Sequence, residues 1–91
     1  MSRSVRLEPE RHFTLRVGDL ATLSISEKQY SMGFAGDSLT LLKKRQRGDS
    51  TVFVYRAIQP GNTTLIASPQ NLPGDHCISC VTEHYFISVV P

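Results

Sequence analysis

Short runs in which apolar and polar residues alternate dominate this sequence. In residues 13–17, Phe13, Leu15 and Val17 are apolar and the residues between them are polar. A period of two places successive side chains on opposite faces of a β-strand, so such a run predicts a strand with one buried and one solvated face. Comparable runs predict further strands at residues 20–25, 30–34, 38–42, 51–58, 63–67 and 81–90.

Turn-forming residues separate these runs. Gly18-Asp19, Gly36-Asp37 and Pro60-Gly61-Asn62 are typical turn sequences. Residues 43–50 are polar throughout and end in a Gly-Asp-Ser sequence, which predicts an exposed connection, and residues 68–79 predict a long irregular loop. Residues 51–58 carry apolar side chains on both faces, which predicts a central strand.

About seven strands without helical patterns between them predict an all-β fold, an immunoglobulin-like antiparallel β-sandwich. A small β-barrel is the alternative, because alternation does not distinguish a closed sheet from two packed sheets. The length of 91 residues has room for one hydrophobic core, so we expect a single domain over residues 1–91.

Residues 53–65 read as an aromatic-x-aromatic-x-Ala strand (Phe53, Tyr55, Ala57), a Pro-Gly turn and a further strand. In this pattern the segment resembles bacterial immunoglobulin-like domains, and within them the chagasin-type cysteine protease inhibitors. The resemblance implies a sandwich that blocks papain-like proteases with three loops at one end. The family's Asn-Pro-Thr-Thr-Gly, Gly-rich and Arg-Pro-aromatic loop motifs are not found here, and residues 26–30 read Ser-Glu-Lys-Gln-Tyr at the place of the first.

Composition and charge restrict the function classes. Ten Lys and Arg residues against eight Asp and Glu residues give a formal charge of +2, too balanced for a dedicated nucleic-acid binder. No apolar stretch is long enough to span a bilayer, so we expect no membrane insertion. No nucleophile elbow, metalloprotease motif or phosphate-binding Gly loop is present, so we expect neither an enzyme nor a cofactor. We also expect the chain to be a monomer.

One cluster contains metal-capable side chains, namely His76, Cys77, Cys80 and His84. Thiolates and imidazoles suit zinc, but the Cys-x-x-Cys spacing lacks a second knuckle. A Cys77–Cys80 disulfide that tightens the loop is the preferred prediction, and free thiols are the third alternative.

The other cluster is basic and comprises Lys43, Lys44, Arg45 and Arg47, followed by Asp49 within an Arg-Gly-Asp-Ser sequence. It predicts a solvated loop, or a charged edge that discourages strand pairing. A nucleic-acid site is less favoured because the cluster contains no aromatic side chains that could stack on bases. If the domain contacts a protein partner, we expect these residues and the loops at 26–30 and 68–79 to do so.

The sequence therefore favours a non-catalytic protein-binding or structural module of a bacterial protein. We expect it in the periplasm or on the cell surface if a signal peptide was removed, and the partner stays unidentified. A loop-based inhibitor of papain-like cysteine proteases is the alternative function, and a small zinc-binding domain is the second alternative.

Overall fold

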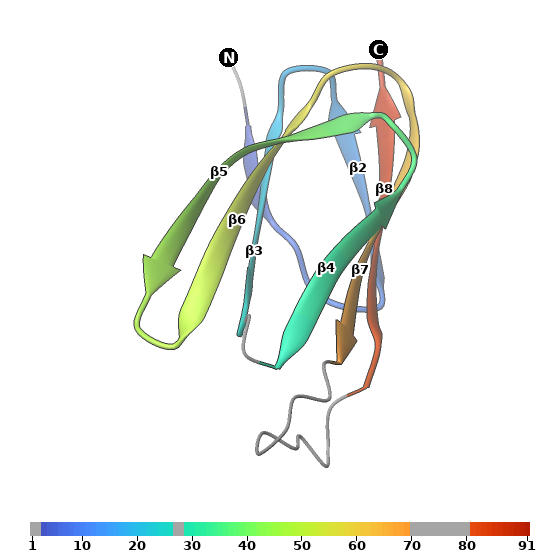
Figure 1. Ribbon diagram of the computed structural model, residues 1–91. Helices are drawn as coiled ribbons and strands as arrows, with labels where there is room; N and C mark the ends of the chain where they lie inside the picture. Colours follow the sequence, from blue (N-terminus) through green and yellow to red (C-terminus); the bar gives the residue numbers. More distant parts are fainter. Residues whose placement is uncertain (1–2, 27–28, 70–80) are drawn as a thin grey trace.

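The computed structural model describes residues 3–26, 29–69 and 81–91, and it shows two β-sheets that face each other (Figure 1). No helix occurs in these three ranges. The eight strands are β1 (Ser4–Arg6), β2 (Arg11–Arg16), β3 (Leu20–Ile25), β4 (Tyr30–Ala35), β5 (Leu39–Arg47), β6 (Ser50–Ala57), β7 (Gly61–Pro69) and β8 (Glu83–Val90). The predicted all-β sandwich is confirmed, with one strand more than expected.

The strand order is β1-β3-β6-β5 in one sheet, called sheet A here, and β2-β8-β7-β4 in the other, called sheet B. Strand β1 runs parallel to β3, and β2 runs parallel to β8, whereas the other neighbours are antiparallel. Each sheet therefore contains two antiparallel pairs and one parallel pair, and the parallel pairs are a detail that the predicted antiparallel sandwich did not include. Alternation identifies strands but not their directions, and the parallel pairs arise because the chain changes sheet after β1 and again after β2.

The core lies between the sheets and consists of the inward side chains of alternating residues. Leu15, Leu23, Leu65 and Ile87 are among its almost fully buried members. Burial of side chains of this size contributes roughly 1.5–3 kcal/mol each before the loss of chain entropy is counted. Val17 is an exception to the predicted pattern because β2 ends at Arg16, and Val17 is 45% exposed in the following turn.

Strand β6 is central in sheet A, as the two-sided apolar pattern predicts. It pairs with β3 on one side and with β5 on the other. Phe53, Tyr55 and Ala57 belong to the core cluster, whereas Val54 is 6% exposed and lies outside that cluster. Buried apolar side chains therefore lie on both faces of β6.

Two sequence-based expectations were wrong in this sheet. Residues 43–47 do not form a connection, because β5 continues through them to Arg47 and leaves only Gly48 and Asp49 as the turn. Pairing with the Val-rich strand β6 supplies the backbone hydrogen bonds, so a polar sequence is acceptable in a strand whose side chains are exposed. Strand β1 was missed because three residues with one apolar side chain give no readable alternation.

Candidate functional site

Three chain connections leave the sandwich at the same end, opposite the two termini (Figure 1). Strand β3 ends and β4 begins there, β5 turns into β6 there, and β7 ends and β8 begins there. We call this region the loop end. The described residues that flank the three predicted partner segments, at the ends of these six strands, therefore lie at one end of the molecule.

Local hydrogen bonds hold the described parts of two of these connections. The backbone N–H groups of Gln29 and Tyr30 both donate to the Ser26 carbonyl oxygen, at 3.1 and 2.9 Å. In the β5–β6 turn, Gly48 has a positive φ of 59°, which glycine adopts at little cost. The Gln46 amide donates to the Gly48 carbonyl at 2.9 Å and accepts a bond from the Thr51 hydroxyl at 3.0 Å, so the turn is braced by its flanking strands.

Glu83, Tyr85 and Tyr30 form a group of polar side chains near the start of β8 at the loop end. The Tyr85 hydroxyl donates to the Glu83 carboxylate at 3.0 Å. Burial, followed by the hydrogen bond and charge of Glu83, raises the pKa of Tyr85 far above its ordinary value. Burial and the charge of Glu83 also raise the pKa of Tyr30, against a smaller lowering by a backbone hydrogen bond with Val81. Both phenols are therefore neutral at physiological pH and act as fixed hydrogen-bonding groups.

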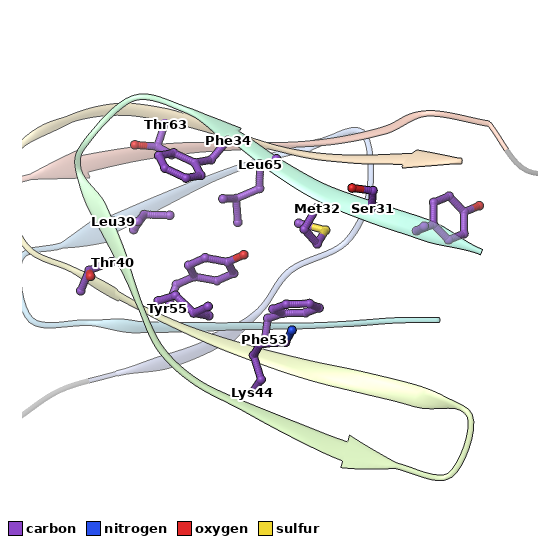
Figure 2. Close-up of a pocket in the computed structure, with 13 residues that line it drawn as sticks. Ser31, Met32, Phe34, Leu39, Thr40, Lys44, Phe53, Tyr55, Thr63 and Leu65 are labelled. Atoms are coloured by element: carbon purple, nitrogen blue, oxygen red, sulfur yellow. The ribbon is translucent and has the colours of Figure 1, made fainter. Parts of the chain in front are cut away.

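A cavity of about 590 Å³ lies between β4 of sheet B and β5 of sheet A, and we call it the cleft (Figure 2). Figure 2 shows Phe53 and Tyr55 on one wall and Met32 and Leu65 on the other. Phe34 pairs in register with Leu65, which is 1% exposed, yet Phe34 itself is 72% exposed. Phe34 therefore lies on the core-facing side of a sheet where no described side chain from the opposite sheet covers it.

Sequence reasoning missed the cleft. The alternation of Tyr30, Met32 and Phe34 correctly indicates a strand with an apolar face. It does not indicate whether the opposite sheet reaches far enough to cover that face, because that depends on how the two sheets diverge.

The predicted partner residues of the basic cluster lie on both faces of β5. Lys43, Arg45 and Arg47 pair in register with Val54, Val52 and Ser50, on the outer face of sheet A. Lys44 pairs with Phe53 and faces inward, with its Nζ atom 5.2 Å from the centre of the Phe53 ring. Asp49 is exposed in the turn. The alternative prediction of a charged sheet edge thus describes these four cations better than a loop does.

Of the predicted zinc or disulfide residues, His76, Cys77 and Cys80 lie outside the described residues, so both hypotheses stay predictions. His84 lies on β8, where its backbone N–H donates to a Glu10 carboxylate oxygen at 3.0 Å and its Nδ1 atom is 3.3 Å from that oxygen. Its ring stacks on Phe86 with 5.9 Å between the centroids. Within the described ranges, no three His, Cys, Asp or Glu residues are grouped as a metal site would need, and no helix suits a membrane crossing.

The sequence matches no protein-family model and no curated protein. Among solved structures, the fold is similar to that of the cysteine protease inhibitor EhICP2 from Entamoeba histolytica, with a TM-score of 0.66 and 12% identity over 98% of this chain and 95% of the inhibitor. It is also similar to amebosin, with a TM-score of 0.59 and 10% identity over 99% of both chains. These likenesses span whole chains and support the predicted similarity to the chagasin-type sandwich fold.

Proposed function

We propose that this chain is a non-catalytic protein-binding module whose loop end inhibits a papain-like cysteine protease. The observation that carries the proposal is that six strand ends lie together at one end of a sandwich that has, over nearly its whole length, the fold of a cysteine protease inhibitor.

The physical basis is the local order of the β5–β6 turn and of the strand ends around it. The described stems of the loop end are held by the Gln46–Gly48 and Tyr85–Glu83 hydrogen bonds. Connections that are ordered before binding lose less conformational entropy when they enter a protease groove, and a preorganised surface binds more tightly for the same buried area. A loop end in the groove would inhibit by excluding the substrate, which requires no chemistry from this chain.

The contacts in such a complex would be made by this chain's own residues, because the family's loop motifs are absent from its sequence. Val81 is 66% exposed beside the start of β8, and Asp49 is exposed in the β5–β6 turn. An exposed valine at the centre of a contact would bury its whole side chain, so Val81 is the sharpest position at which to probe the surface.

The test is inhibition of papain, measured as hydrolysis of a fluorogenic peptide at micromolar concentrations of the full chain. We expect competitive inhibition, and we expect Val81→Asp to weaken it at least about tenfold because the substitution places a charge in a desolvated contact. Val17→Asp is the matched control, because Val17 is also exposed but lies at the terminus end, where its N–H donates to the Val90 carbonyl.

Absence of inhibition of papain and of a panel of related proteases at these concentrations would contradict the proposal. Equal weakening by Val17→Asp and Val81→Asp would also contradict it, since the inhibition would then not come from the loop end. Circular dichroism spectra of both variants establish that each is folded.

A further inference from the structure

The two sheets differ strongly in charge. The four strands of sheet A contain six of the ten Lys and Arg residues and none of the eight Asp and Glu residues of the chain. The strands of sheet B contain two Arg residues and one Glu. The small net charge of the chain therefore hides one basic sheet, and an acidic partner would be attracted to that sheet.

Strand β5 concentrates this charge in a row. Lys43, Arg45 and Arg47 occupy alternate positions on its outer face, so their Cα atoms recur about every 6.8 Å along the strand. The same face is hollowed to a volume of about 460 Å³, and its lining includes these three cations together with Leu20, Val52 and Val54. Cations thus stand beside an apolar surface.

The other face of β5 looks into the cleft. Leu41 pairs in register with Tyr55 and is 44% exposed, and Phe34 is 72% exposed across the cleft. Strand β5 is the last strand of sheet A and pairs only with β6 in the described part of the chain. Its second edge consequently presents backbone donors and acceptors between an outer face with three cations and an inner face that carries Leu41 and, beside the Phe53 ring, Lys44.

We propose that this edge of β5 binds an extended acidic segment of a partner protein as an additional strand of sheet A. In such a pairing, carboxylates on one face of the segment lie beside Lys43, Arg45 and Arg47, and apolar side chains on its other face cover Leu41 and Phe34 in the cleft. Strand addition of this kind derives affinity from main-chain hydrogen bonds and specificity from the alternate side chains. The cations select the partner, since cross-strand pairs of opposite charge stabilise a sheet and like charges oppose pairing.

A protein segment fits this surface better than a nucleic acid does. The aromatic residues of the sheet A strands are Phe53 and Tyr55, and both face the core, so none can stack on a base from the outer face. The apolar cleft on the inner side of β5 also has no counterpart in a phosphate backbone, whereas an alternating peptide presents an apolar face to it.

The test uses the full chain labelled with ¹⁵N and a synthetic eight-residue peptide of alternating Glu and Val. We expect chemical-shift changes centred on the β5 amides and slower hydrogen exchange at those β5 amides that do not bond to β6. Binding should weaken as NaCl is raised, because exposed ion pairs are screened. The slowed exchange is the signature of strand addition, which charge attraction alone does not produce.

Matched variants locate the electrostatic part. Arg45→Gln with Arg47→Gln should raise the dissociation constant about 2- to 30-fold, as expected for the loss of two cross-strand ion pairs. The control is Arg11→Gln with Arg16→Gln, which removes the same charge from the exposed β2 residues of sheet B and should leave binding unchanged. A second control peptide has the same side chains but carries N-methyl groups on the alternate residues whose N–H groups would face β5. It should not bind, because it cannot donate main-chain hydrogen bonds to the β5 edge.

No binding at millimolar peptide, equal loss in both double variants, or unchanged exchange in β5 would each overturn the proposal. Stronger binding of a single-stranded DNA of equal charge would overturn it in favour of a nucleic-acid surface. The variants and peptides used here do not involve Val81 or the protease assay, so failure of this proposal and failure of loop-end inhibition are distinguishable.

Discussion

The two long sides of the sandwich are closed in different ways. On the side of β1 and β2, which we call the closed side, the chain crosses between the sheets through Leu7. Leu7 is 5% exposed within the core, and its N–H donates to the Thr22 carbonyl at 2.7 Å. On the side of β4 and β5, the open side, the crossing residues 36–38 lie at one end and the sheets diverge beyond them to form the cleft (Figure 1).

A buried carboxylate reinforces the closed side. The two oxygens of Asp19 accept backbone N–H bonds, from Arg16 at 2.9 Å and from Arg3 at 3.1 Å. The Arg3 guanidinium lies 3.7 Å from the same carboxylate. Asp19 thereby joins the residue before β1, the end of β2 and the start of β3.

A buried pair of hydrogen-bonded residues lies at the narrow end of the open side. The Ser38 N–H donates to the Thr63 hydroxyl at 3.1 Å, the two hydroxyl groups are also hydrogen-bonded, and both residues are buried. Phe34 and Leu41 lie beyond the Ser38–Thr63 pair and are exposed. The same two sheets therefore form a sealed core on one side and an exposed apolar surface on the other, and the difference lies in the connections between the sheets.

The sharpest test of the comparison is one apolar truncation on each side. Leu7→Ala should lower the free energy of unfolding by about 2–5 kcal/mol, since it leaves a cavity in a sealed core. Phe34→Ala should change it by no more than about 0.5 kcal/mol, because an exposed side chain loses little on truncation. Urea unfolding of both variants measures the difference, and similar losses would show that the open side is sealed in solution.

A smaller effect is expected from the two glycines at the open side. Gly36 has a φ of 113°, and a Cβ atom there would clash with the Asn62 carbonyl oxygen. Gly36→Ala should therefore cost about 1–3 kcal/mol from the backbone conformation alone. Gly33 has no atom within 4 Å of an added Cβ, so Gly33→Ala should stabilise the protein by roughly 0.4–1 kcal/mol. Thermal unfolding distinguishes these outcomes, and a neutral Gly36→Ala would refute a tight crossing.

Most strands could be predicted from the sequence, whereas the contacts that close one side of the sandwich could not. Alternation identified seven of the strands and the central place of β6, because burial on one or both faces is encoded in each run. It could not place Leu7, an isolated apolar residue between charged ones, or anticipate that Asp19 is buried rather than exposed in a turn. Those roles depend on contacts between segments far apart in the chain, as does the cleft. The basic cluster was visible, but its two faces became apparent only from the register of β5 with β6.

Because backbone hydrogen bonds to the Asp19 carboxylate stabilise the closed side, we expect acid to weaken that side. The backbone N–H bond from Arg16, followed by that from Arg3, lowers the pKa of Asp19 below its ordinary value of 3.8. A group whose pKa is lower in the folded state stabilises the fold above its unfolded pKa, and this stabilisation is lost as the pH falls through the folded pKa. Asp19→Asn should therefore destabilise the protein at neutral pH and reduce the loss of stability below about pH 4. Unfolding free energies measured from pH 7 to pH 2 test this, and parallel curves for both proteins would refute it.

The smallest effect on stability, and the one most specific to the open side, concerns its two edge strands. Strand β4 contains no charged residue, whereas β5 contains four cations, and each pairs with one described neighbour. Charged side chains on an edge prevent pairing with other chains, so the triple variant Lys43→Thr, Arg45→Thr, Arg47→Thr should self-associate at lower concentration than the parent. Ser31→Lys on β4 should shift association in the opposite direction. Sedimentation velocity over a concentration series measures both shifts. If the triple variant sediments as the parent does, the β5 cations do not protect that edge, and their alignment would then require another reason, such as the acidic partner strand proposed above.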